Sequence, residues 1–158
     1  MDNKSENHSY LSFAINEEIY AAKVHSVVEV LEQQPITLIP KSPKHIKGVV
    51  SFRGEIIPVI DARTIMNIPD HPLSDYVIIV FTVKNENFDE RHTVGTIADH
   101  VENVIEIKPL DIVPTTELNS IVDPKFTFGV FKDINRFVTI LDTDKIFAIS
   151  NNKPQYDL

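Results

Sequence analysis

Residues 48–65 read GVVSFRGEIIPVIDARTI, and residues 129–146 read GVFKDINRFVTILDTDKI. The two stretches align without a gap at an offset of 81 residues, and both run from a glycine through two apolar segments around a turn to an aspartate. A second pair, residues 23–30 and 100–107, aligns at an offset of 77. Solenoid repeats have periods of about 20–50 residues, so this longer period indicates one small fold that occurs twice.

The length of 158 residues fits one domain with a shared core. A half of about 70 residues rarely buries enough apolar surface to be stable alone. We therefore expect a single domain over residues 9–149, with a first barrel half at 10–68 and a second at 75–147. Residues 1–8 and 150–158 are expected to be flexible tails.

The composition indicates which cellular compartment and which classes of partner the protein has. The chain has no cysteine, which excludes disulfides and thiolate catalysis and fits a reducing compartment. The polar start carries no signal sequence, and no apolar run reaches the ~18 residues of a membrane span. A net charge of −8 opposes binding to nucleic acid or anionic lipid. These features predict a cytoplasmic protein that does not insert into the membrane and whose partners are proteins or small molecules.

The local patterns predict an all-β fold. Residues 10–15 alternate apolar and small or polar side chains, and residues 27–30 are β-branched apart from one glutamate, as is typical of strands. Proline-rich loops follow at 33–47 and 108–125. Each half then contains five short strands, about the number that closes a small barrel. We expect two similar five-stranded SH3-like β-barrels packed together, with short helical turns.

The duplicated stretch predicts a hairpin in each barrel. Gly54 and Asn135 occupy the same turn position, and glycine and asparagine best tolerate a positive φ. Asp61 and Asp142 follow the hairpins and precede potential short helices at 62–66 and 143–147. An aspartate there is expected to be a helix N-cap worth ~1 kcal/mol.

No residue pattern indicates catalysis or metal binding. Asp61 and Asp142 resemble a carboxylate pair, but acid–base chemistry requires convergence on one reacting atom, and these residues lie in different barrels. The six histidines show no metal-ligand spacing, and neither a phosphate-binding glycine loop nor a nucleophile elbow occurs. We expect no enzyme activity, no metal site and no cofactor.

Arg53 is the first candidate for a functional residue. The second copy has Ile134 in its place, so the scaffold does not itself require an arginine beside the turn. Two interpretations remain open: a solvated side chain, or an anchor for a protein partner, because arginine is enriched at interface hot spots. Glu29 and Glu106 interrupt apolar strands, which the alternating pleat explains without a function.

The ordered motifs resemble the CheW-like family of bacterial chemotaxis coupling proteins. Residues 48–63 are similar to the family signature G-V-x-N-L-R-G-x-I-x-P-V-x-D-L-R, and residues 140–147 are similar to its closing L-L-D-x-D-K-L-L. Residues 27–30 and 94–101 resemble its V-x-E-V and V-G-x-x-V-D-x-V segments. Ser51 and Phe52 replace Asn and Leu, and Ala62 replaces Leu.

This resemblance implies a two-barrel, non-catalytic adaptor. Such a protein would couple the cytoplasmic tips of methyl-accepting chemoreceptors to the regulatory domain of a chemotaxis histidine kinase. Val27, Glu29 and Arg53 match family positions for receptor binding. Gly48 and Gly54 match positions for kinase binding or coupling. A small-molecule-binding β-barrel sensor or regulatory module remains the alternative, and it would require a pocket of several hundred Å³.

Overall fold

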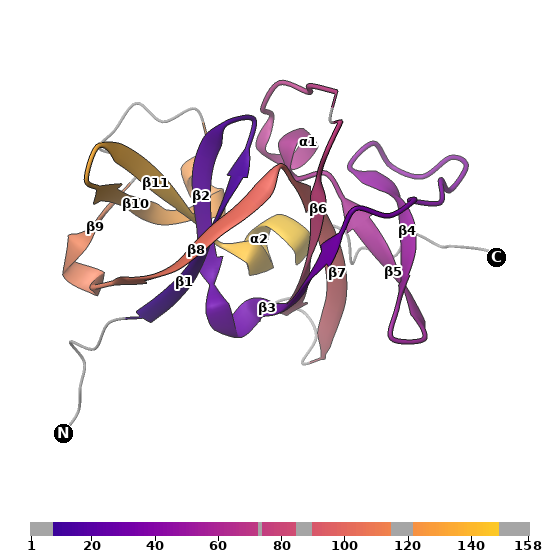
Figure 1. Cartoon of the computed structure of the whole chain (residues 1–158), viewed down its shortest axis with the longest axis horizontal. Coiled ribbons are helices and arrows are strands. Elements are labelled where there is room, and N and C mark those ends of the chain that lie inside the picture. The colour runs from indigo at the N-terminus through magenta and orange to yellow at the C-terminus, as the bar shows by residue number, and fades with distance from the viewer. Residues whose placement is uncertain (1–7, 73, 85–89, 115–121, 149–158) are drawn as a thin grey trace.

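The computed structural model of the chain describes residues 8–72, 74–84, 90–114 and 122–148, and it consists of two packed β-sheets (Figure 1). We call them the six-stranded barrel, in the order β8-β1-β2-β11-β10-β9, and the five-stranded barrel, in the order β3-β6-β7-β5-β4. The strands of the six-stranded barrel are β1 (His8–Ile15), β2 (Glu18–Lys23), β8 (His100–Ile107), β9 (Ile112–Val113), β10 (Thr127–Asp133) and β11 (Arg136–Leu141). Those of the five-stranded barrel are β3 (Val27–Glu32), β4 (Ile46–Phe52), β5 (Glu55–Ile60), β6 (Val77–Lys84) and β7 (Arg91–Ala98).

The expected all-β class with two barrels is confirmed, and the helical elements are short. Those within the described residues are the α-helices α1 (Ala62–Met66) and α2 (Thr143–Phe147) and the 3-10 turns η1 (Val24–Ser26), η2 (Pro109–Asp111) and η4 (Pro124–Phe126). Asp61 and Asp142 cap α1 and α2 as predicted, since their carboxylates accept from backbone N–H groups of the first turn. The expected tails lie outside the described residues, except that β1 begins at His8.

The duplicated stretch forms one hairpin in each barrel, as predicted. Hairpins β4–β5 and β10–β11 share the same antiparallel register, and each has a register shift beside its glycine, Gly48 or Gly129. Gly54 has a positive φ of 81°, which confirms the expected turn. In the second hairpin, however, Ile134 has the positive φ of 47°, and Asn135 does not. Asn135 thus lies in the hairpin turn, as predicted, but the positive φ expected of it belongs to Ile134.

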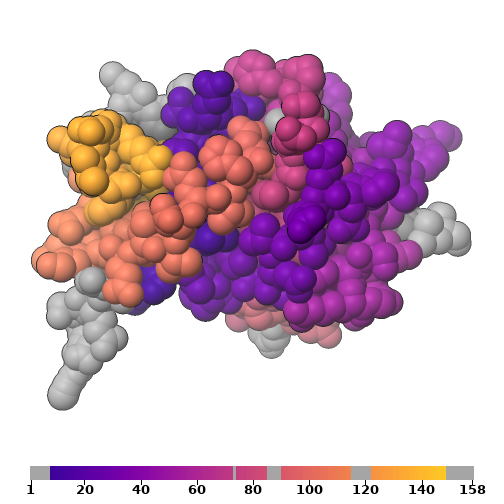
Figure 2. All heavy atoms as spheres, viewed as in Figure 1, coloured from indigo at the N-terminus to yellow at the C-terminus, as the bar shows by residue number. Residues whose placement is uncertain are grey.

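The two halves of the sequence do not form separate barrels. Hairpin β1–β2 pairs with β8 and β11 of the second half, and hairpin β6–β7 pairs with β3 and β5 of the first half. In Figure 1 the indigo β1 and β2 accordingly lie beside the orange strands, and Figure 2 shows indigo atoms among the orange and yellow ones. The predicted halves 10–68 and 75–147 are thus wrong as barrel boundaries, because each repeat gives its first hairpin to the other.

The physical reason for this error is that a strand pattern defines a buried face and not a pairing partner. The apolar alternation of a strand is the same whether its backbone hydrogen bonds go to a neighbour in sequence or to a distant strand. The connections make the exchange possible. The turn η1 links β2 to a strand of the other barrel, and Asp99 alone links β7 to β8.

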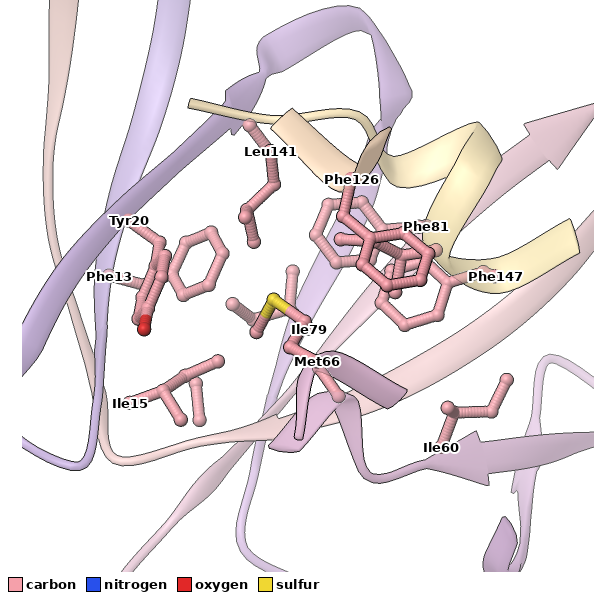
Figure 3. Close-up of a cluster of buried hydrophobic side chains, with 14 of the residues drawn as sticks. Phe13, Ile15, Tyr20, Ile60, Met66, Ile79, Phe81, Phe126, Leu141 and Phe147 are labelled. Atoms are coloured by element: carbon pink, nitrogen blue, oxygen red, sulfur yellow. The ribbon is translucent and has the colours of Figure 1, made fainter. Parts of the chain in front are cut away.

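The largest group of buried apolar side chains lies between the barrels and includes residues from both. Phe81 of β6 stacks on Phe147 of α2 with ring centroids 5.5 Å apart, and Met66 of α1 lies near the centre of the cluster (Figure 3). Smaller clusters fill the five-stranded barrel, around Val59 and Val80, and the six-stranded barrel, around Val138. The barrels therefore share a core, as the length of the chain led us to expect.

We predict that Phe147→Ala destabilises both barrels together. Removing a buried aromatic ring typically lowers the free energy of unfolding by about 3–5 kcal/mol, and the shared core transmits this loss to both sheets. Denaturant unfolding combined with hydrogen exchange of amides in both sheets measures it. Phe137→Ala is the matched control, because Phe137 is 59% exposed. Two separate unfolding transitions, one for each barrel, would contradict the shared core.

Candidate functional site

Two of the candidate residues, Arg53 and Gly54, lie in the turn of hairpin β4–β5. Arg53 and Gly54 occupy the two turn positions with φ of 51° and 81°, the combination of a type I′ hairpin turn. Phe52 and Ile57 point into the five-stranded barrel and are buried, and this orientation places Arg53 at the exposed tip. The turn therefore presents Arg53 at the end of a paired hairpin. Its left-handed backbone conformation is uncommon for a residue with a Cβ.

Arg53 and Glu29 form an ion pair across the barrel. The Nη2 of Arg53 donates to Oε1 of Glu29 at 2.7 Å, and the guanidinium lies 4.8 Å from the centroid of the Phe52 ring. The side chains remain 66% and 42% exposed. The structure thus brings together two of the three residues that sequence reasoning assigned to receptor binding. Their contact itself was not predicted.

Val27, the third of these residues, lies on the same strand as Glu29, but it has a different environment. It is half-buried and packs against the core between the barrels. A register shift between Val27 and Glu29 interrupts the pairing of β3 with β6. Val27 consequently has an evident packing role, and its assignment to a partner surface stays a prediction.

The fold itself requires a glycine at position 48, whether or not a partner binds there. Its φ is 152°, and a Cβ at this position would lie 2.7 Å from Cγ2 of Ile36 and overlap the carbonyl of Thr37. Thr37 pairs with Val49 here in an isolated bridge. Gly129 is restricted in the same way, by Ile112 and Val113 of the strand that crosses it. Both copies therefore need a glycine at the point where another segment crosses the hairpin.

An apolar groove of about 420 Å³ lies on the outer face of this hairpin. Its lining residues are Thr37, Ile39, Val49, Val50, Ser51, Ile56 and Pro58. Ile56 is 64% exposed, and Leu38 beside the groove is 75% exposed. Sequence reasoning missed this surface, although Ile56 and Ile57 are adjacent in a strand and only one of them can face the core.

Asp61 and Asp142 are equivalent in sequence but not in electrostatics. Burial favours a raised pKa for Asp61, but the hydrogen bonds and the charge of Arg63 outweigh it, and the pKa is lowered. Asp142 is also desolvated, and this burial together with the charge of Asp144 outweighs the backbone hydrogen bond from Lys145, so its pKa is raised. Their carboxylates cap different helices. This arrangement fits two structural caps and offers no convergent acid–base pair.

Among residues 8–72, 74–84, 90–114 and 122–148, no group of three or more acidic or histidine side chains is arranged to hold a metal ion. None of the helices in these ranges is long and apolar enough to cross a membrane. The interior of the five-stranded barrel is filled by its own side chains, including Val59, Ile78 and Val80.

Comparisons with known proteins agree with this arrangement over nearly the whole chain. The sequence model of the CheW-like domain matches residues 9–150. The chemotaxis protein CheW of Thermotoga maritima is 33% identical over 138 residues, which cover 86% of this chain and 85% of that protein. The probable chemotaxis protein CheW of Rhizobium etli is 27% identical over 139 residues, with 87% and 86% covered. The scaffolding protein TtCheW from Thermoanaerobacter tengcongensis has a similar structure, with a TM-score of 0.76, 30% identity and 89% and 92% coverage.

We predict that the two capping aspartates respond differently to amidation. Asp61→Asn removes the buried one of the two carboxylates beside Arg63 and leaves the exposed carboxylate of Asp70. Loss of a buried ion-pair partner typically lowers the free energy of unfolding by about 3–5 kcal/mol, and we expect the lower end of this range because Asp70 remains. Asp142→Asn retains a capping oxygen and is expected to change it by no more than ~0.5 kcal/mol at pH 7. The expectation from sequence, a similar weakened cap at both positions, is revised accordingly.

Their pH dependences should have opposite signs. The lowered pKa of Asp61 means that its contribution to stability is present above the ordinary pKa of an aspartate and is lost as the pH falls. The raised pKa of Asp142 means that its contribution is present at low pH and is lost as the pH rises through the folded-state pKa. The test is to measure the free energy of unfolding of the unchanged protein, Asp61→Asn and Asp142→Asn from pH 3 to pH 7, and to compare each variant with the unchanged protein. Parallel pH profiles for the two variants would contradict the electrostatic difference.

We predict different costs at the two glycines of the hairpin. Gly54→Val should lower the free energy of unfolding by about 1–2 kcal/mol through backbone strain alone, because open space surrounds the position. Gly48→Val adds a clash with Thr37 and Ile36 and should cost more. Gly54→Asn is the control, since asparagine tolerates a positive φ. No loss for Gly54→Val would show that the turn is under no such constraint, and equal losses at both positions would show that the contact with Thr37 and Ile36 adds nothing.

Proposed function

We propose that this chain, which belongs to the CheW-like family of chemotaxis coupling proteins, is a non-catalytic cytoplasmic adaptor that links chemoreceptor tips to a kinase regulatory domain. The family membership follows from the match over residues 9–150. The adaptor role in chemotaxis agrees with the named relatives and with the scaffolding protein of similar structure. The two partners and the surfaces that bind them are our proposals.

The observation that carries the proposal is that one hairpin presents two chemically different surfaces. Arg53 and Glu29 form a charged surface at the tip of β4–β5, and the apolar groove lined by Val49 and Ile56 covers the outer face of the same hairpin. A charged, solvated contact and an apolar contact suit different partners. An adaptor needs two such surfaces on one rigid support.

We assign the receptor contact to Arg53, Glu29 and Val27. An exposed ion pair contributes only about 0–1 kcal/mol to folding, so Arg53 can exchange Glu29 for a carboxylate of the receptor tip at little cost. The cytoplasmic tips of methyl-accepting chemoreceptors would supply this partner. Burial of the planar guanidinium in such a contact gives both affinity and orientation.

We assign the regulatory domain of the histidine kinase to the apolar groove. Exposed Ile56 and Leu38 provide side chains that a partner can bury. Gly48 lets the segment at Thr37 cross the hairpin and thereby forms one wall of the groove. Gly54 sets the turn that ends it. Both glycines would then affect kinase coupling through the shape of the groove and not by direct contact.

The other function classes have weaker support. Catalysis is disfavoured by the capping roles of Asp61 and Asp142, which engage both carboxylates in hydrogen bonds to their own helices. A small-molecule sensor would require a suitable cavity, and the groove of about 420 Å³ meets that size. It lies, however, on the outer face of a hairpin beside exposed Leu38 and Ile56, which suits a protein partner better than an enclosed ligand.

We predict that Arg53→Glu weakens receptor binding and leaves the fold intact. The loss of an arginine anchor typically costs ~2 kcal/mol or more, about thirtyfold in affinity, whereas the exposed ion pair contributes little to stability. Titration against soluble receptor tips and thermal unfolding measure the two effects. Binding to the isolated kinase regulatory domain should change less.

Two further variants test whether a loss of receptor binding comes from a direct contact of Arg53 or from its ion pair with Glu29. The double variant Arg53→Glu with Glu29→Arg restores an ion pair with reversed polarity but offers the receptor a different surface. Arg136→Glu is the matched control, since Arg136 pairs with Glu102 in the six-stranded barrel at 2.7 Å. Full recovery of receptor affinity in the double variant would mean that the ion pair matters and that Arg53 makes no direct contact.

We predict that Ile56→Asp weakens binding of the kinase regulatory domain by about tenfold or more, because a charge in an apolar contact loses ~1.4 kcal/mol or more. The change lies on the surface and should alter stability by no more than ~0.5 kcal/mol. Phe137→Asp is the control, because Phe137 occupies the equivalent position in the other copy and is similarly exposed. Calorimetric titration decides it. Equal losses for both variants would place the kinase contact elsewhere.

A further inference from the structure

Arg63 of α1 is only 4% exposed, yet the hydrogen bonds of its guanidinium extend in three directions. Nε and Nη2 donate to Oδ1 and Oδ2 of Asp61 at 2.9 and 3.0 Å, and Nη2 lies 2.9 Å from Oδ1 of Asp70. Nη1 donates to the carbonyl of His71 at 2.8 Å and to Oδ1 of Asn16 at 3.5 Å. The guanidinium thus makes four hydrogen bonds and a further ion pair with Asp70.

The partners of Arg63 come from both barrels. Asn16 lies at the tip of hairpin β1–β2, which belongs to the six-stranded barrel, whereas Arg63, Asp70 and His71 follow β5 of the five-stranded barrel. Asn16 also donates from Nδ2 to the carbonyl of Pro69 at 2.6 Å. The tip of the exchanged hairpin is therefore held by polar contacts to the segment that follows the other barrel.

The second exchanged hairpin has a related attachment. The backbone N–H of Lys84, at the end of β6, donates to Oδ1 of Asp144 at 2.9 Å. Asp144 occupies the place of Arg63 in the duplicated stretch, two residues after the capping aspartate. In both copies the same position of the short helix thus contacts the hairpin that its own copy gives to the other barrel, through different chemistry.

We propose that Arg63 is a positioning residue that fixes the orientation of the two barrels through Asn16. The apolar core between the barrels attracts them without a strong directional preference. A buried charge with four hydrogen bonds accepts few alternative arrangements, because each one leaves a polar group unsatisfied. Arg63 therefore selects one orientation among those that the core permits. This inference goes beyond the coupling role and does not depend on the identity of either partner.

The test measures the distance between the barrels in the folded protein. The chain has no cysteine, so Ser51→Cys and Lys132→Cys introduce two spin labels at equivalent exposed positions, one on each barrel. Pulsed electron–electron double resonance then measures the distribution of distances between the two labels. In the otherwise unchanged protein we expect one narrow distribution.

Two variants remove the attachment in different ways. Asn16→Gly deletes the side chain amide and retains the left-handed turn conformation, because Asn16 has a φ of 54°. Arg63→Lys keeps a cation beside Asp61 but loses the planar fork that reaches Asn16 and His71. Both are expected to gain a second distance population. Arg136→Lys is the matched control, since Arg136 and Glu102 both lie in the six-stranded barrel, and its distribution should stay narrow.

Circular dichroism establishes that each variant is folded before its distances are compared. A second population in Asn16→Gly and Arg63→Lys, with none in Arg136→Lys, supports the positioning role. Should Arg63→Lys fail to fold, Asn16→Gly alone decides, because it leaves the buried charge pair in place. A wild-type distribution in the folded variants, or equal broadening in the control, overturns the proposal.

Discussion

The apolar core between the barrels is the contact on which the rest of the molecule depends. It joins side chains from both sheets and both α-helices, with the stacked rings of Phe81 and Phe147 on one side and Met66 near the centre (Figure 3). The clusters inside each barrel are smaller. Because each repeat also supplies a hairpin to the other barrel, neither half has a complete sheet alone. Folding and the placement of the proposed partner surfaces consequently depend on both halves of the chain.

Duplication separates what the scaffold requires from what function adds. Gly48 and Gly129 are restricted in the same way, since another segment crosses both hairpins. Asp61 and Asp142 both cap helices. The two copies differ at other equivalent positions. Arg53 corresponds to Ile134, Ile56 to Phe137 and Arg63 to Asp144. One fold therefore presents a charged tip and an apolar groove on one barrel and different side chains on the other.

The charged groups of the molecule have two distinct physical roles. Arg53 and Glu29 are exposed, so water screens their attraction and leaves them available to a partner. Arg63 and Asp61 are buried, so their hydrogen bonds are costly to break and restrict the structure. The exposed pair makes a single contact and the buried pair is bidentate, and we propose exchange with a partner for the first and orientation of the barrels for the second.

The sequence alone determined the repeat, the strands, the hairpins, the capped helices and the family resemblance, because these depend on local patterns and on spacing along the chain. It also identified Glu29 and Arg53 as candidates, but not their contact across 24 residues. Only the tertiary structure decided which repeat receives each first hairpin, that Ile56 lines a groove, and that Arg63 reaches Asn16. The reason is that backbone pairing and side chain contact depend on which distant segments meet. A strand pattern records burial without naming the neighbour that provides it.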